Sequence, residues 1–197
     1  YELSDITMEF GIKTLYKIRA LKNFSDVKKG DLGGWVSSEN NLSQEGDCWI
    51  YDEAKCMDNA RMYDDSCMYN GSRMFGNSRM HNNSKMFGNS VMCGYSEMWD
   101  NSKMYDNSKM YNNSMMCGSS VMCDNSKMCD DSMMCGNSKM FGNSMMYGHS
   151  KMHGNSMMSG NSKMYDDSKM CDNSAMFGNS AMFENSVMRD YSTMRDN

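Results

Sequence analysis

Residues 101–118 read NSKMYDNSKMYNNSMMCG, which is three copies of one six-residue unit. The unit, Asn-Ser-x-Met-x-Gly/Asp, recurs through most of the chain. Every sixth residue from Met62 to Met194 is methionine, and every sixth residue from Ser66 to Ser192 is serine. A fixed short period is typical of solenoids, in which each repeat stacks on its neighbours. The repeat therefore predicts the architecture of most of the chain.

Alternation within the unit predicts which side chains face inward. Alternate residues of a strand share a face, so the Ser and Met of each unit point to one side. The Gly, Asp and Asn pairs between units favour bends, because they tolerate left-handed backbone angles or hydrogen-bond to their own backbone. The other side carries lysines such as Lys103 and Lys109, whose burial would be costly. Ser and Met are therefore expected to line the interior.

We expect an all-β fold: a single-stranded, left-handed parallel β-helix of three-residue strands with a small N-terminal β cap. Eighteen residues per coil, in a triangular prism, is the first expectation, and twelve, in a flattened coil, is the alternative. With eighteen, the repeats give roughly seven to eight coils at about 4.8 Å each. The chain contains no proline, as expected where strand pairing needs every backbone N–H group.

The first part of the chain differs in kind from the repeats. Residues 2–9 and 12–21 are rich in β-branched and aromatic side chains around Phe10-Gly11, a pattern typical of a β-hairpin. We expect residues 1–46 to form a hairpin cap with a connecting loop, and residues 47–197 to form the solenoid.

The two ends of the solenoid carry different signals. Its first coil has an apolar end that needs a cap, and Trp35 and Trp49 are expected to take part in covering it. The last residues, YSTMRDN, stop in mid-pattern. This leaves open a longer natural chain, a frayed end, or self-association by stacking on another molecule.

A segment before the repeats carries a resemblance. Residues 23–54 read NFSDVKKGDLGGWVSSENNLSQEGDCWIYDEA. They resemble the leader of an uncharacterised bacterial and phage family of hexapeptide-repeat β-helix proteins, often labelled acyltransferases. The repeats are similar to that family's G-N-A-R-V-Y unit, with Ser in place of Ala and Met in place of Val. The resemblance implies a left-handed parallel β-helix, whereas the transferase label rests on fold analogy.

Composition argues against several classes of protein. The net charge is −5 with acidic and basic residues interspersed, which gives no footprint for nucleic acid. No apolar run approaches membrane-spanning length, and the N-terminus lacks a signal-peptide pattern. We expect a cytoplasmic protein, bacterial or phage-encoded, although a chain that begins at Tyr1 leaves secretion through a removed leader open.

The cysteines are expected to be free thiols. Nine is an odd number, and most of the nine fall at repeat positions rather than in a disulfide framework. Neighbouring strands about 4.8 Å apart are also wider than the roughly 3.8 Å between the Cβ atoms of a disulfide.

Catalysis is not expected. Hexapeptide acyltransferases, which the repeat resembles, generally interrupt it with an insertion loop and use a histidine base between the subunits of a trimer. Residues 60–197 contain no insertion. His81 and His153 take the outward place that Tyr, Phe and Cys take elsewhere, and His149 lies in a bend, so surface decoration is the simpler interpretation.

The methionines allow two interpretations. Methionine is a flexible apolar filler, so the column is first of all a core. Alternatively, stacked thioethers and thiols bind a soft ion such as Cu(I) or Ag(I). With eighteen residues per coil, Cys117, Cys135, His153 and Cys171 share an outward column. The candidate metal ligands are Met115, Met116, Cys117, Met133, Met134, Cys135, His153 and Cys171.

Our functional prediction is a non-enzymatic structural or interaction scaffold. Outward aromatics such as Tyr69 and Phe87 are expected to form stabilising ladders, or else a contact surface for self-association, a partner or sugars. A soft-metal-binding solenoid is the alternative, with Cu(I) as its only candidate cofactor. A hexapeptide acyltransferase that binds acetyl-coenzyme A comes third.

Overall fold

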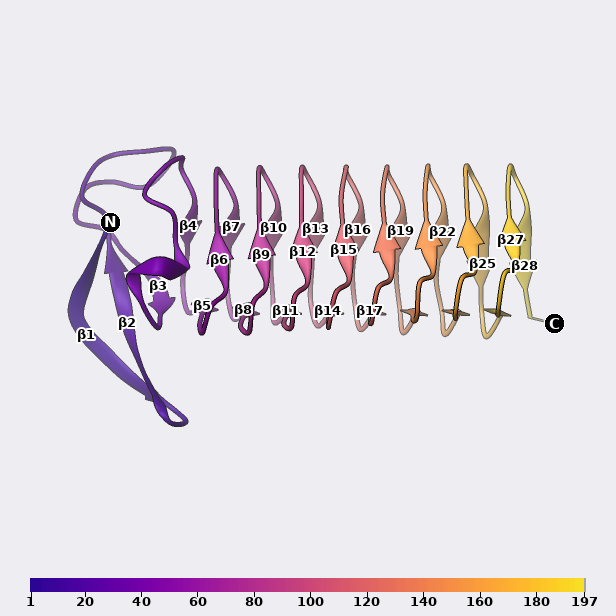
Figure 1. The fold of residues 1–197 in the computed structure, drawn as a ribbon. Coiled ribbons are helices and arrows are strands. Elements are labelled where there is room, and N and C mark those ends of the chain that lie inside the picture. The colour runs from indigo at the N-terminus through magenta and orange to yellow at the C-terminus, as the bar shows by residue number, and fades with distance from the viewer. Residues whose placement is uncertain (197) are drawn as a thin grey trace.

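The computed structural model describes residues 1–196, and it has a parallel β-solenoid that follows an N-terminal antiparallel hairpin (Figure 1). Three sheets form the three sides of the coil. The first sheet consists, in order, of β1 (Glu2–Phe10), β2 (Lys13–Arg19), β3 (Leu32–Val36), β5 (Lys55–Cys56), β8 (Arg73–Met74), β11 (Val91–Met92), β14 (Lys109–Met110), β17 (Lys127–Met128), β20 (Met145–Met146), β23 (Lys163–Met164) and β26 (Ala181–Met182).

The other two sheets contain only strands of the solenoid. The second consists of β4 (Trp49–Ile50), β7 (Cys67–Met68), β10 (Lys85–Met86), β13 (Lys103–Met104), β16 (Val121–Met122), β19 (Lys139–Met140), β22 (Met157–Met158), β25 (Ala175–Phe177) and β28 (Thr193–Arg195). The third consists of β6 (Arg61–Met62), β9 (Arg79–Met80), β12 (Glu97–Met98), β15 (Met115–Met116), β18 (Met133–Met134), β21 (Lys151–Met152), β24 (Lys169–Met170) and β27 (Val187–Met188).

The strand register fixes the coil length. Lys85 pairs with Lys103 and Met86 with Met104, eighteen residues further on. The same spacing links successive strands in all three sheets of the repeat region. Eighteen residues per coil is therefore confirmed, and the twelve-residue alternative is wrong.

Most of the strands are two residues long rather than the expected three. The residue after each Met still joins the ladder, as Tyr69 N–H does by donating to the Met86 carbonyl oxygen at 2.9 Å. The next residue, Asn70, has a φ of 58°, in the left-handed region, so the chain turns at once. The bend residues therefore set the strand length.

The interior is filled by the predicted residues. The inward methionines from Met62 to Met176 have no exposed surface, and the inward serines from Ser66 to Ser174 are equally buried. The hydroxyls of five serines donate to the carbonyl oxygen three residues earlier, as Ser126 does to Cys123 at 2.8 Å. We expected either these bonds or bonds from serine to serine. Among residues 1–196 no bond runs from serine to serine, and fifteen other inward serines, Ser84 and Ser102 among them, have a buried hydroxyl without a hydrogen-bond partner. The expectation that such bonds would satisfy the inward hydroxyls therefore holds for only five serines.

The cap has the predicted hairpin, in which β1 pairs antiparallel with β2. β3 belongs to both parts of the chain, because it pairs antiparallel with β2 and parallel with β5. The division at residue 46 therefore stays a prediction. Trp35 and Trp49 are buried here, with the Trp49 ring against the edge of Phe24 at a centroid distance of 5.4 Å.

A short 3-10 helix, η1 (Glu39–Asn41), ties the cap to the first coil. The Asn41 side chain is 1% exposed. Its Oδ1 accepts from the backbone N–H of Ser37 and Ser38, and its Nδ2 donates to the carbonyl oxygens of Asp58 and Ala60. Within residues 1–196 no helix is long and apolar enough to cross a membrane.

Candidate functional site

The outward side chains of the coil form columns. An outward column is the line of side chains that hold the same position in successive coils. The column after the methionines of the third sheet holds most of the residues singled out in the sequence. We call it the cysteine column, and it consists of Tyr63, His81, Trp99, Cys117, Cys135, His153 and Cys171. Backbone hydrogen bonds between successive coils keep its members in line.

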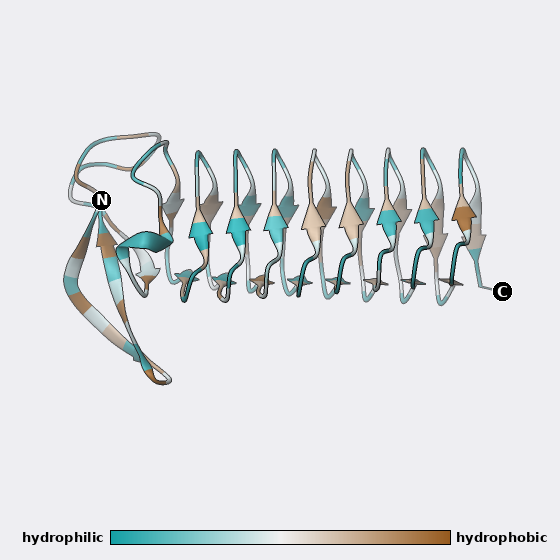
Figure 2. Cartoon of the chain, viewed as in Figure 1, coloured by the Kyte–Doolittle hydropathy of each residue, from teal (hydrophilic) through white to brown (hydrophobic). Residues whose placement is uncertain are grey.

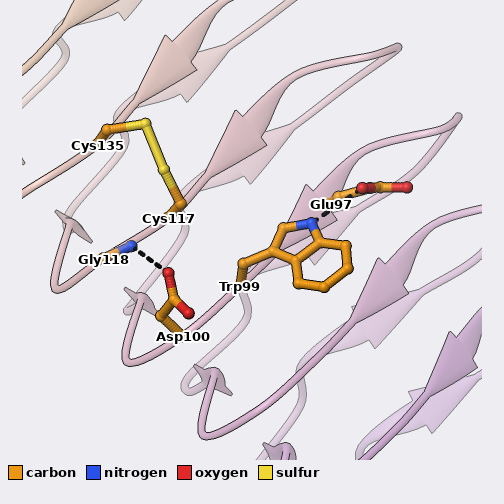
Figure 3. The surroundings of a disulfide bond; sticks show 6 residues. All are labelled: Glu97, Trp99, Asp100, Cys117, Gly118 and Cys135. Carbon is orange, nitrogen blue, oxygen red and sulfur yellow. Dashed lines mark hydrogen bonds between the residues drawn. A yellow bond between two sulfur atoms is a disulfide. The ribbon is translucent and has the colours of Figure 1, made fainter.

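Two members of the cysteine column are joined. Cys117 and Cys135 form a disulfide between adjacent coils, with their Cα atoms 4.8 Å apart (Figure 3). The expectation that these thiols stay free was wrong. Equivalent residues of adjacent coils point the same way, and 4.8 Å lies within the usual Cα separation of about 4.4–6.8 Å for disulfides. The other seven cysteines are unbonded, and Cys48, Cys56 and Cys67 are buried.

Aromatic rings precede the disulfide in the same column. The His81 ring lies between those of Tyr63 and Trp99, with centroid distances of 4.8 and 3.8 Å. Burial lowers the pKa of His81, so its neutral form is favoured. Figure 3 shows Trp99 on the coil before Cys117, where its Nε1–H donates to Glu97 at 2.9 Å. This arrangement gives His81 a stacking role.

The eight predicted metal ligands do not form one site. Met116 and Met134 are fully buried inside the coil, whereas Met115 and Met133 lie outside as partners on adjacent strands. The eight candidates therefore lie on both sides of the coil wall, because neighbouring residues of a strand face opposite sides, and metal binding by them stays a prediction. In Figure 2 the outer pair stands out as two pale-brown strands, β15 and β18, between teal neighbours.

His153 and Cys171 follow the disulfide in the column, but their surroundings are cationic. Lys151 lies two residues before His153, and Lys169 lies two residues before Cys171. Met115 and Met133 hold the equivalent positions before the two cysteines of the disulfide. Burial, and then the two lysines, lower the pKa of His153. Within residues 1–196 no three His, Cys, Asp or Glu side chains gather as they would around a metal ion.

The third histidine, His149, lies at a bend. Its Nε2 is 3.5 Å from Asp131 Oδ2, and its side chain is 65% exposed. A histidine and a carboxylate are thus close together, and both side chains are exposed to solvent. His149 therefore lacks the sheltered surroundings that favour a general base, whereas the buried Nε2 of His81 has no hydrogen-bond partner, in the described part of the chain, with which to exchange a proton.

Aromatic stacks occupy the other two columns that follow methionines. Tyr51, Tyr69, Phe87 and Tyr105 stack in one, with successive centroid distances of 4.5, 4.7 and 4.9 Å. Tyr147, Tyr165 and Phe183 stack in the other, at 5.3 and 5.0 Å. The predicted ladders are present, and Phe183, at the end of the second stack, is 56% exposed.

Sequence reasoning missed the asparagine ladders at the bends. A ladder from Asn137 to Asn173 precedes the second sheet, and a longer one precedes the first sheet. The Nδ2 of Asn125 donates to Oδ1 of Asn143 at 3.3 Å, and the pattern continues to Asn161 at 3.0 Å and Asn179 at 2.9 Å. The signal was an asparagine at every eighteenth position, which becomes visible only when the chain is written in coils.

Comparison with known proteins finds a short similarity and no family. No family model matches the chain. A curated protein of Escherichia coli (strain K12) named "Uncharacterized acetyltransferase YdcK" is 51% identical to it over 39 residues. That match covers 20% of this chain and 12% of the relative, so the chain spans a small part of that protein. It is a partial similarity to a protein labelled as an acetyltransferase.

Proposed function

We propose that this chain is a non-enzymatic β-solenoid scaffold, which presents regularly spaced outward columns to a partner. The observation that carries the proposal is the unbroken register of the coils, whose inward places are filled by Met and Ser. A filled interior has no room for a substrate. The chemistry that the chain can offer therefore lies on its outer faces.

The proposal that the chain is not an enzyme has separate support. Catalytic groups need a partner within hydrogen-bond reach and a place for the reacting atom. His81 is held between two rings, His153 is near the like charges of Lys151 and Lys169, and His149 is largely exposed to solvent. The similarity to the Escherichia coli acetyltransferase covers too little of either chain to outweigh this.

Titration of the protein with acetyl-coenzyme A by calorimetry tests the proposal. No binding is expected, and the unfolding temperature should stay the same after treatment with a metal chelator. Saturable binding of acetyl-coenzyme A, together with slow acetyl transfer to an amine or hydroxyl acceptor, would contradict it. Sedimentation velocity in the same buffer tests whether the aromatic stacks mediate self-association.

A second candidate function, soft-metal binding, is favoured by the outer face of β15 and β18. Met115 and Met133 are partners there, and Cys117 and Cys135 lie two residues further along the chain, just past the ends of these strands. Once a thiol reductant has supplied the two electrons that open the disulfide, two thiolates and two thioethers would be neighbours. Such donors suit Cu(I).

Anaerobic titration with Cu(I) against a competing chelator, before and after reduction, tests this candidate. Tight uptake of about one equivalent is expected only after reduction, and the double change Met115→Leu/Met133→Leu should weaken it. If Cu(I) uptake is the same before and after reduction and in the double variant, the metal is bound by other thiols.

A further inference from the structure

The first sheet carries a groove on its outer face. It has a volume of about 570 Å³, within the range of about 300–1,000 Å³ typical of ligand sites. We call it the basic groove, and it is lined by Arg73, Asn89, Val91, Asn107, Lys109, Asn125 and Lys127. The cations and Val91 form one column along it, and the three asparagines form a second column at the preceding bends. Its one apolar residue, Val91, lies between Arg73 and Lys109. The valine side chain is shorter than either cation, which leaves space between them.

The cations of the basic groove are unpaired. Val91 pairs with Arg73 on one side and with Lys109 on the other, and Lys109 pairs in turn with Lys127. Like charges directly opposite each other on paired strands are destabilising. Within residues 1–196, none of these three side chains takes part in an ion pair. A bound anion would relieve their repulsion.

One wall of the groove consists of Asn89, Asn107 and Asn125, in the same outward column as the longer asparagine ladder. From Asn125 to Asn161, each asparagine of this column donates one amide hydrogen to the following asparagine, as Asn125 does to Asn143. An amide has two donor hydrogens and two acceptor lone pairs, so each ladder member keeps capacity to spare. The wall therefore offers both donors and acceptors at every coil, which suits a ligand rich in hydroxyl groups.

Carboxylates near the groove are engaged elsewhere. Asp124 Oδ2 accepts from the backbone N–H of Gly142 at 2.8 Å, in the bend of the next coil. The second sheet differs, because the hollow beside its Lys85 is lined by Asp26, Asp47 and Asp65. The third sheet also has stacked cations beside asparagines, where Asn59, Arg61, Asn77 and Arg79 line a smaller hollow of about 370 Å³, but Arg79 there forms an ion pair with Glu97. Among the described residues, the basic groove differs in having no acidic residue in its lining and no ion pair on its cations.

We propose that the basic groove binds a linear anionic polysaccharide, whose carboxylate or sulfate groups meet Arg73, Lys109 and Lys127 and whose hydroxyls meet the asparagine wall. The inference rests on the proposed scaffold function and names its partner. Tyr111, two residues beyond Lys109, offers an aromatic surface to the sugar rings beside the cations.

A polysaccharide fits this surface better than a nucleic acid does. The amides suit hydroxyl groups that repeat along the whole ligand. The net charge of −5 opposes the binding of any polyanion, so the amides beside the three cations, rather than charge, favour a polymer rich in hydroxyl groups.

The test uses the whole protein and two matched double variants. Lys109→Gln/Lys127→Gln removes one in-register lysine pair from the groove. Lys85→Gln/Lys103→Gln removes another such pair from the second sheet, with the same change in net charge. The probes are polygalacturonate, which carries carboxylates, and heparin, which carries sulfates. Dextran is the uncharged control, and duplex DNA is the competing class. Binding is measured by biolayer interferometry at fixed ionic strength.

The wild-type protein is expected to bind at least one of the two anionic polysaccharides and not dextran. The groove variant should lose about tenfold in affinity, as expected for the loss of two charge-assisted contacts, while the second-sheet variant binds as the wild type does. The ratio between polygalacturonate and heparin tells which anion the groove prefers.

Three results would overturn the inference: no binding of either polysaccharide, equal losses in both variants, or tighter binding of DNA than of both polysaccharides. If the protein binds neither these polymers nor acetyl-coenzyme A and stays folded, only the inference about the groove fails. If it binds acetyl-coenzyme A and transfers the acetyl group, the proposed scaffold function fails, and so does the inference about the groove that rests on it.

Discussion

At the scale of single residues, the core is unusual in being written almost entirely in Met and Ser. Methionine is unbranched and adapts its shape to the space between coils, so one residue type can fill every inward place. The serine beside it is small, and its backbone N–H donates to the carbonyl three residues earlier, as in the bond from Ser144 to Phe141. Met therefore fills the apolar interior, and the small Ser fits at the end of the bend, next to the following strand.

Inward and outward methionines should differ in their contribution to stability. Met158→Ala is expected to lower the free energy of unfolding by about 2–5 kcal/mol, because it leaves a cavity at a fully buried position. Met157→Ala, the control beside it in β22, changes an outward side chain and should cost less than about 1 kcal/mol. Urea denaturation followed by circular dichroism measures both. Equal losses would contradict the inward placement.

Alkaline pH should weaken the end of the solenoid that lies under the cap. Burial raises the pKa of Cys48 to about 12 from its usual value of 9.0. Above pH 9 the thiol ionises in the unfolded chain but keeps its proton in the folded chain, so stability is lost between pH 9 and about 12. Cys48→Ala should make the unfolding midpoint less dependent on pH between 8 and 11. An unchanged slope would show that Cys48 is accessible.

At the scale of elements, the bends decide where strands start and stop. Asp, Asn or Gly occupies nearly every left-handed position of the repeat, and these residue types reach that region at the least cost. At Gly142, with a φ of 67°, an added Cβ would also lie 2.8 Å from the Gly160 carbonyl oxygen in the next coil. Backbones of successive coils therefore touch closely at glycine bends.

The disulfide should lock two coils together. The double change Cys117→Ser/Cys135→Ser opens a closed loop with a sequence separation of 18, and it is expected to lower stability by about 3 kcal/mol. Thermal unfolding without reductant measures this loss, and a reductant should remove the difference from the wild type. Cys123→Ser is the control, because Cys123 is unbonded. A wild-type protein that unfolds alike with and without reductant would lack the bond.

The repeat predicted the elements well and the contacts between columns less well. The inward and outward places and the hairpin follow from alternation and turn residues, which are local properties of the chain. The bond between Cys117 and Cys135 and the asparagine ladder depend on contacts between residues eighteen apart. Such contacts become predictable only once the coil length is known, and the six-residue period alone allows twelve or eighteen.

At the scale of the whole molecule, stability should vary along the axis. Each coil contacts only its neighbours, so a solenoid can open from an end without unfolding elsewhere. Inward methionines in the middle, such as Met122, are fully buried, but Met188 is 8% exposed. Tyr191, in the bend that precedes β28, is 85% exposed.

Hydrogen exchange read by mass spectrometry should reflect this gradient. Amides of β27 and β28 are expected to exchange first, and those of the central coils last, because the central coils lose their protection only when an opening reaches them. Peptides on either side of the disulfide serve as internal references. Uniform exchange along the chain would instead mean that the solenoid unfolds as one cooperative unit.

The coil of three interchangeable hexads has a consequence for how such a gene can change. Loss or gain of eighteen residues between repeats would leave every downstream side chain on its own face, since each sheet advances by that spacing. Loss or gain of six would keep the interior intact but move every downstream residue to the next face. Recombination between the repeats can thus shuffle the surface without disturbing the fold, so new combinations of outward columns can arise in single genetic steps.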